Sequence, residues 1–218
     1  PLNNWTLWHE VGHNAAESPF AIDGAGEVVN NILGLYIQEK HLGKMERVER
    51  SIRIVNNQIE NESGHVWGAV GGGVRLLMFA QLKIWAEQKF DINQWYTSLP
   101  SFYDTTDGMK GWNMFKLMHR LKRNQNDSAI QLKGTNQCYG QTHLNVNDRL
   151  MLCASYAAQK DFIDFFSTWN AGSQANLVPG ETEPIYTGGI SDAGKAAVAA
   201  LNLPKPTLDP LTINSLVP

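Results

Sequence analysis

The stretch Trp8-His9-Glu10-Val11-Gly12-His13 contains the pattern His-Glu-x-x-His and decides the class of fold that we expect. In a helix, positions i and i+4 project from the same face, so His9 and His13 can bind one metal ion together. Three protein ligands and one open position are typical of catalytic zinc sites rather than structural ones. We therefore predict one catalytic Zn²⁺ ion, held by this helix and by a third ligand from elsewhere in the chain.

Downstream of His13, the chain offers carboxylates for the third ligand position. Glu17 lies one turn further along the same helix, where its side chain would point past the metal. The glycines and prolines that follow allow the chain to reverse, and a second helical pattern begins at Glu27 and runs to Tyr36. Glu27, in the first turn of that helix, is the predicted third ligand, and Asp23 on the connecting loop is a weaker alternative.

Three asparagines are candidates for orienting a histidine ligand. Asn30 and Asn31 follow Glu27 by three and four residues, on its side of the helix, and Asn14 follows His13 directly. Side-chain amides can hold a metal-bound imidazole in place. An ordinary role as polar helix residues explains Asn30 and Asn31 equally well, so both interpretations stay open.

These residue types predict hydrolysis of a peptide bond. Zinc lowers the pKa of a bound water to roughly 7, and Glu10, beside His9, would act as general base and then as general acid. A further donor would stabilise the oxyanion. The sequence does not choose among four candidates for that donor, which are Tyr96, Tyr103, His119 and His65.

Longer segments around these residues resemble the enhancin-like zinc metallopeptidases. Within that family, the chain is similar to the C-terminal part of the secreted, surface-associated lipoprotein mucinases of enteric bacteria. The similar segments span nearly the whole chain: Trp8–Glu17, Gly26–Asn31, Arg75–Lys83, Gly108–Asn113, Met151–Ser155 and Leu203–Pro206. The resemblance implies that His9, His13 and Glu27 are the zinc ligands and that Glu10 is the catalytic residue.

The resemblance also implies a substrate and a location. We expect a mucin-type, O-glycosylated protein as substrate, and a protein that is secreted or held at the outer surface of a Gram-negative bacterium. Peptidases of this kind carry a sheet-containing lobe before the His-Glu-x-x-His helix, and its edge strand pairs with the substrate. Only eight residues precede His9, so we expect the N-terminal remainder of a larger protein as a partner. The alternative function is a glycoprotein-binding adhesin module with a structural or vestigial zinc site, but an intact Glu10 favours the enzyme.

Composition argues against several other classes of function. The chain has 218 residues, of which 43% are hydrophobic, enough for a substantial core. Lys and Arg total 18 against 21 Asp and Glu, a net charge of -3. This near balance argues against nucleic acid or an anionic membrane as the main partner. We also expect no transmembrane segment in this chain, because no apolar run is long enough to span a bilayer.

Cys138 and Cys153 are the two cysteines of the chain. Their number alone leaves open whether they are bridged or are two buried free thiols. A bridge would close a loop of roughly 15 residues, which stabilises a fold by about 3 kcal/mol in the chain-entropy model. The resemblance to a secreted family favours the disulfide.

Helical periodicity predominates in the rest of the chain, so we expect a mainly α fold, the helical C-terminal lobe of a gluzincin-type metallopeptidase with few short strands. Apolar residues from Val74 to Trp85 recur at helical spacing and predict an amphipathic helix facing a core. Further helices are expected at 112–123, 148–159, 162–169 (after a cap at Asp161) and 191–201, and short strands at 51–55 and 184–187. Residues 1–202 would form the lobe, and residues 203–218, rich in proline, an extended tail.

Two further patterns have competing interpretations. Gly71-Gly72-Gly73 invites comparison with a phosphate-binding loop, but the Lys-Ser/Thr of that motif is missing, so a tight entry into a helix is the better prediction. Trp67, Trp95 and Trp112 could stack on sugar rings, although burial in the core is the stronger expectation for each of them.

Overall fold

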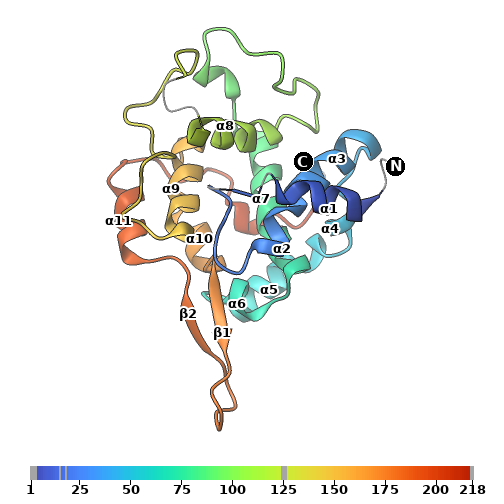
Figure 1. The fold of residues 1–218 in the computed structure, drawn as a ribbon, viewed down its shortest axis with the longest axis vertical. Coiled ribbons are helices and arrows are strands. Elements are labelled where there is room, and N and C mark those ends of the chain that lie inside the picture. The colour runs from blue at the N-terminus through green and yellow to red at the C-terminus, as the bar shows by residue number, and fades with distance from the viewer. Residues whose placement is uncertain (1–3, 15, 18, 124–126, 217–218) are drawn as a thin grey trace.

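Helix α7 (Gly72–Lys89) runs through the centre of the computed structural model, which describes residues 4–14, 16–17, 19–123 and 127–216 (Figure 1). All residues from Leu76 to Ala86 are buried, as in a helix that other elements cover on every side. The predicted helix is therefore confirmed, but the expected amphipathic character is not. The tight entry predicted at Gly71-Gly72-Gly73 is confirmed, since Gly71 is extended and the helix begins at Gly72.

Four other predicted elements are present. Helix α8 (Trp112–Arg123) has the predicted bounds. Helices α9 (Val146–Ala158) and α11 (Asp192–Ala199) differ from the prediction by one or two residues at each end, and α10 (Ile163–Trp169) begins one residue later than predicted. The cap predicted at Asp161 is wrong by one residue, because Phe162 is the N-cap of α10. Oδ1 of Asp161 still accepts a hydrogen bond from the backbone N–H of Ile163 at 2.8 Å.

The strand predicted at residues 51–55 is wrong. This segment forms a 3₁₀ turn, η1 (Ile52–Ile54), followed by helix α5 (Val55–Glu62). Ile52 and Val55 are buried, whereas Ile54 is 52% exposed. Burial three residues apart is typical of a helical face, so the apparent alternation of apolar residues did not reflect a strand.

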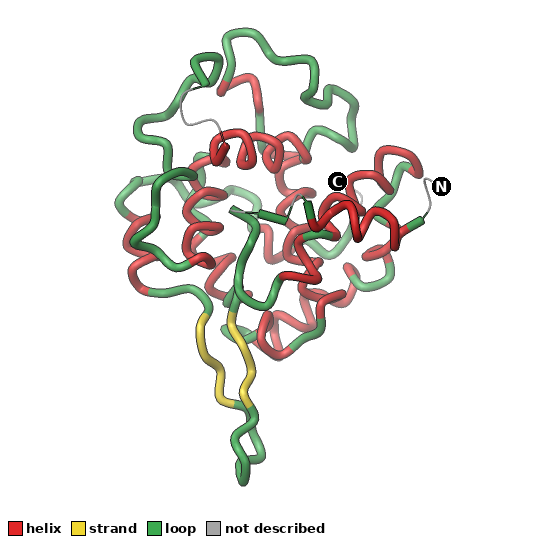
Figure 2. The backbone as a smooth tube through the Cα atoms, in the orientation of Figure 1, coloured by secondary structure: helices red, strands yellow, loops and turns green. Residues whose placement is uncertain are grey.

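A two-stranded antiparallel hairpin projects from the helical body (Figures 1 and 2). Strand β2 (Ile185–Gly188) confirms the strand predicted at 184–187, and it pairs with β1 (Ser173–Asn176). Strand β1 was not predicted, because its sequence Ser-Gln-Ala-Asn is polar and mostly exposed. The structure is thus mainly α, as expected. The remaining short elements are α4 (Glu46–Glu49), α6 (Val66–Ala69), η2 (Ile92–Trp95) and η3 (Pro210–Thr212).

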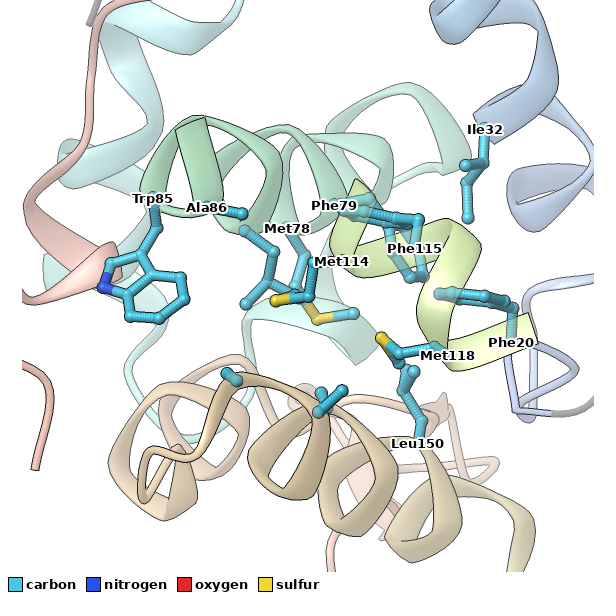
Figure 3. Packing of buried hydrophobic residues seen from close by; sticks show 14 of the residues in the cluster. Phe20, Ile32, Met78, Phe79, Trp85, Ala86, Met114, Phe115, Met118 and Leu150 are labelled. Atoms are coloured by element: carbon cyan, nitrogen blue, oxygen red, sulfur yellow. The ribbon is translucent and has the colours of Figure 1, made fainter. Parts of the chain in front are cut away.

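One hydrophobic core joins α7, α8 and α9 (Figure 3). Met78 and Phe79 of α7 face Met114 and Phe115 of α8, and Leu150 of α9 closes the other side. Packing of this kind stabilises each large side chain by roughly 1.5–3 kcal/mol relative to exposure. Helix α8 is thereby held against the centre of the molecule.

The ends of the long connections are tied to this core. Cys138 and Cys153 form the expected disulfide, which joins the loop before α9 to α9 itself. Nε1 of Trp85 donates to the carbonyl of Leu208 at 3.0 Å, and the Gln81 amide donates to that of Ile213 at 3.0 Å. These bonds hold part of the 203–218 segment against α7, and the boundary at residue 202 stays a prediction. Within the described ranges, no helix combines the length and apolar character that crossing a membrane requires. Ala15, Ser18 and Pro218 lie outside the described residues.

Candidate metal centre

Helix α1 (Trp5–His13) carries both histidines of the motif. It begins after Asn4, whose side chain accepts a hydrogen bond from the backbone N–H of Leu7 at 3.1 Å. His9 and His13 are four residues apart, so their rings lie on one face of the helix, with centroids 5.1 Å apart. The helix presents both imidazoles to the segment that packs on this face.

That segment consists of α2 (Gly26–Val29) and α3 (Asn31–Leu42). The sequence predicted one helix beginning at Glu27. The structure has two helical segments that meet at Asn30, a residue that keeps right-handed helical angles. Glu27 lies in the first turn of α2, as predicted.

Two glycines allow this segment to approach α1 closely. A Cβ atom on Gly12 would lie 1.9 Å from the carbonyl oxygen of Asn30. A Cβ atom on Gly34 of α3 would lie 3.2 Å from the ring of Trp5. No larger residue fits at Gly12 without movement of the backbone, so this glycine sets the distance between the histidines and the segment that carries Glu27.

Glu27 completes a group of three potential metal ligands. Its Oε2 atom lies 3.0 Å from Nε2 of His9 and 3.9 Å from Nε2 of His13. The ligand atoms of all three residues lie within 4.8 Å of one another. Tetrahedral zinc with bonds of about 2.0–2.2 Å holds its ligand atoms roughly 3.3 Å apart. Two imidazole nitrogens and a carboxylate oxygen at these distances could hold one metal ion.

The group is open to solvent on one side. The side chain of Glu27 is 77% exposed, while that of His9 is 22% exposed. Glu10, next to His9 on α1, is also exposed. An open side is what a catalytic metal site requires, because a water molecule and a substrate must both reach it.

Asn31 contacts the first histidine. Its Oδ1 atom lies 2.9 Å from Nδ1 of His9 and can accept the Nδ1–H proton. This tautomer leaves the lone pair of Nε2 free on the side of Glu27.

Asn30 lies between the two rings. Its amide nitrogen is 3.2 Å from both ring nitrogens of His9 and 3.1 Å from Nε2 of His13. Its Oδ1 atom is buried and has no hydrogen-bond partner among the described residues. The amide of Asn30 thus lies close to the ring nitrogens that could hold a metal ion.

The rival candidates make other contacts. Glu17 forms an ion pair with Arg123, and the Asp23 carboxylate accepts a hydrogen bond from the amide of Asn147 at 3.0 Å. Neither belongs to the group formed by His9, His13 and Glu27. The Asn14 amide donates to the carbonyl oxygen of Val11, so its expected role in orienting a histidine is not supported.

The four oxyanion candidates also have local contacts of their own. The hydroxyls of Tyr96 and Tyr103 are 2.9 Å apart, and burial raises the pKa of both groups. His65 stacks on Tyr186, and His119 packs against Phe20 with ring centroids 4.7 Å apart. None of these contacts directs a side chain toward the metal ligands, and the role stays unassigned.

The stronger expectation for three tryptophans, burial in the core, is confirmed, and their alternative role in sugar stacking is not supported. Trp67, Trp95 and Trp112 are at most 2% exposed. The indole N–H of Trp95 donates to the carbonyl of Ala157, and that of Trp112 donates to the carboxylate of Glu39. These rings belong to the core, and of the three only Trp112 also lines a cavity.

Sequence reasoning missed a cavity of about 470 Å³ beside α2 and α3. Its lining includes Phe20, Val29 and Ile32, and the α8 residues Trp112, Phe115 and His119. These three α8 residues are spaced at three and four positions, so they lie on one face of the predicted helix, but the sequence did not show what that face contacts. Only the tertiary structure shows which residues of α8 face the cavity and which face the core.

Most of the chain matches a known protein family. Residues 2–170 match the family model described as peptidase M60, enhancin and enhancin-like. The chain belongs to the M60 peptidase family. Membership in a family of metallopeptidases implies a metal cofactor, and His9, His13 and Glu27 are the residues that could hold it.

This M60 chain is similar to curated proteins of enteric bacteria. It is 57% identical to accessory colonization factor AcfD of Vibrio cholerae over 99% of the chain, and 49% identical to putative lipoprotein YghJ of Escherichia coli O78:H11. In both cases the chain spans 14% of the relative's length.

Solved structures share the fold. The IMPa metallopeptidase of Pseudomonas aeruginosa superposes with a TM-score of 0.55 at 19% identity, covering 93% of this chain and 23% of that protein. A conserved protein of unknown function from Bacillus anthracis superposes with a TM-score of 0.50 at 20% identity, covering 98% of this chain and 34% of that protein. At these identities the likeness concerns the fold alone.

Proposed function

We propose that this M60 chain carries the catalytic centre of a zinc-dependent endopeptidase that cleaves mucin-type, O-glycosylated proteins. The observation that carries the proposal is the convergence of His9, His13 and Glu27 within 4.8 Å, on an open face. The family match supports the peptidase class, and the donor set of two imidazoles and one carboxylate suits zinc. His9, His13 and Glu27 are the proposed ligands.

The chemistry of the site divides between the metal and Glu10. Bound zinc would act as a Lewis acid and make a water molecule acidic near neutral pH. Glu10 accepts a proton from the attacking water and returns it to the leaving amine. Its place beside His9 on α1, with an exposed side chain, leaves it free to reach a substrate on the open face.

Two asparagines have proposed supporting roles. Asn31 holds His9 in the tautomer whose Nε2 faces Glu27, through the 2.9 Å contact with Nδ1. Asn30 donates toward both Nε2 atoms, and its amide must turn aside when a cation takes those lone pairs.

The glycoprotein substrate and the location are proposals that rest on the relatives. Two relatives are named as a colonization factor and a putative lipoprotein. These names favour a protein that is secreted or held at the outer surface of a Gram-negative bacterium. The disulfide between Cys138 and Cys153 supports an oxidising compartment.

One experiment tests the proposal. Zinc content by elemental analysis and cleavage of purified mucin are measured for the natural protein and for Glu10→Ala. We expect about one zinc per chain in both, with cleavage only in the natural protein. Zinc without cleavage in either protein would favour the adhesin alternative, and a chain that binds no zinc would overturn the assignment of the ligands.

A further inference from the structure

We propose that the cavity on the opposite face of the α2–α3 segment from the metal ligands binds an uncharged, apolar side chain of the substrate polypeptide, and so directs cleavage to bonds a few residues away from aromatic or long aliphatic residues. The inference rests on the proposed peptidase function and adds a preference for particular substrate residues.

The cavity shares a wall with the metal-binding segment. Val29 lines it immediately before Asn30, and Ile32 and Leu33 line it immediately after Asn31. Positions i, i+3 and i+4 of a helix face one way, and the positions between them face another. The backbone that places Asn30 and Asn31 against the histidines therefore turns Val29, Ile32 and Leu33 to the opposite face of the same segment, toward the cavity.

The loop that leaves His13 forms a second wall. Phe20 of this loop lies flat on Phe115 of α8, with ring centroids 5.5 Å apart, and both rings line the cavity. Figure 3 shows these two rings together with Ile32 at one end of the core. Glu17, in the same loop, pairs with Arg123, another lining residue. The cavity thus lies between α3, α8 and the loop that follows the second histidine.

The size and lining of the cavity suit an apolar group. Its volume of about 470 Å³ lies within the range of roughly 300–1,000 Å³ that is typical of small-molecule sites. That space holds an aromatic side chain together with its neighbouring backbone. Phe20, Trp112 and Phe115 supply aromatic surface, which attracts apolar and aromatic groups.

The polar groups of the cavity argue for an uncharged occupant. Each lining cation is paired with a carboxylate: Lys116 with Asp104 and Arg120 with Asp127, both at 2.5 Å, and Arg123 with Glu17. These pairs leave no cation to bind an anionic side chain, and among the described residues no carboxylate lines the cavity to bind a cationic one. Burial lowers the pKa of His119 to about 4, so its ring is neutral at pH 7. Its Nδ1 atom has no partner within the described part of the chain.

Binding is tested separately from catalysis. The purified Glu10→Gln protein is titrated by ligand-observed NMR with four probes: the N-acetyl amides of phenylalanine, leucine, aspartate and lysine. We expect the phenylalanine and leucine probes to bind at least about fivefold more tightly than the charged ones. Equal binding of all four probes would overturn the proposal.

Two variants with matched controls locate the binding. Phe102, which lines the cavity, is 44% exposed with Arg120 over its ring, and Tyr139, outside the cavity, is 39% exposed with Lys122 over its ring. Phe102→Ala should weaken binding of the phenylalanine probe about threefold or more, and Tyr139→Ala should leave it unchanged. Equal affinities in these two variants would place the probe elsewhere and contradict the proposal.

The second pair changes the wall next to the metal ligands. Leu33 and Ile37 are both half-buried on α3, but only Leu33 is among the cavity residues. In the natural background, Leu33→Asp should reduce cleavage of peptides with an apolar residue at the preferred position and shift the preference, while Ile37→Asp should not. Unchanged cleavage-site preference in Leu33→Asp would overturn the proposal without affecting the peptidase function. Selective probe binding in a protein that cleaves nothing would support the cavity and reject the function.

Discussion

At the scale of single residues, the candidate centre depends on where a few polar atoms point. Helix α1 alone sets the relative position of the His9 and His13 rings. Which ring nitrogen of His9 carries the proton depends on Asn31, which belongs to another helix. Burial likewise makes His119 chemically different from the exposed histidines of the chain. Two predictions belong to this scale.

Replacing Asn31 should weaken metal binding. Asn31→Ala removes the acceptor of the Nδ1–H group of His9, so we expect zinc affinity to fall by roughly 10–100-fold. Competition with a chromophoric chelator measures this change. Asn61→Ala, at an exposed asparagine of α5, is the control and should bind zinc as the natural protein does. An unchanged affinity in Asn31→Ala would show that the contact does not orient the ligand.

The neutral His119 should make the fold sensitive to acid. Burial lowers the pKa of His119 from 6.5 to about 4, so below pH 6.5 the unfolded chain binds a proton that the folded chain does not. The unfolding free energy therefore falls between about pH 6.5 and pH 4, by at most about 3 kcal/mol from this group. Urea unfolding in the presence of a chelator should show a smaller loss for His119→Gln than for the natural protein. His41→Gln, at an exposed position of α3, should keep the full pH dependence, and parallel curves for all three proteins would contradict the assignment.

At the scale of elements, a buried ion group joins α3 to α7 and to the loop before α8. Nζ of Lys83 lies 2.7 Å from the carboxylate of Glu39 and 3.6 Å from that of Glu87, and donates to the carbonyl of Gly108 at 2.6 Å. The indole N–H of Trp112 donates to the other oxygen of Glu39. Helix α3 carries Asn31 at its start, so this group also holds one part of the candidate metal centre in place.

Removing the cation of this group should destabilise the protein strongly. In Lys83→Met the carboxylates of Glu39 and Glu87 stay buried without their partner, which costs roughly 3–5 kcal/mol. Guanidinium unfolding measures the loss, and Lys89→Met, at the exposed end of the same helix, should change stability by less than about 0.5 kcal/mol. Equal stability of the two variants would mean that the carboxylates are protonated or hydrated in the natural protein.

At the scale of the whole molecule, helices cover α7 on all sides, and long connections run over the surface between them (Figure 2). The disulfide restrains one of these connections, which includes the loop before α9. The chain-entropy model assigns about 3 kcal/mol to a bridge that closes a loop of this length.

The double variant Cys138→Ser/Cys153→Ser should therefore be less stable by about 2–4 kcal/mol. The comparison is made by guanidinium unfolding without reductant. The metal ligands lie outside the bridged loop, so zinc content of the folded variant should not change. A loss of zinc at denaturant concentrations where the variant is still folded would show that the disulfide supports the centre directly.

Much of this structure could be anticipated from local pattern. The periodicity from Val74 to Trp85 and from Trp112 to Arg123 predicted the two helices at the centre of the core. The spacing of His9 and His13 predicted two rings on one face. The prediction failed where local pattern is ambiguous, as at residues 51–55, where apolar residues two and three apart are compatible with either a strand or a helix.

The sequence by itself determined which residues are available to a metal, because helix geometry relates His9 to His13 without help from the rest of the chain. Only the tertiary structure decided that Glu27 and Asn31 meet them, since that contact depends on the reversal after His13 and on the close approach at Gly12. It also decided that Trp67, Trp95 and Trp112 are buried and that a cavity opens beside α2 and α3. The physical reason is that periodicity assigns a residue to a face of its own helix, whereas burial and contact depend on which other surface covers that face.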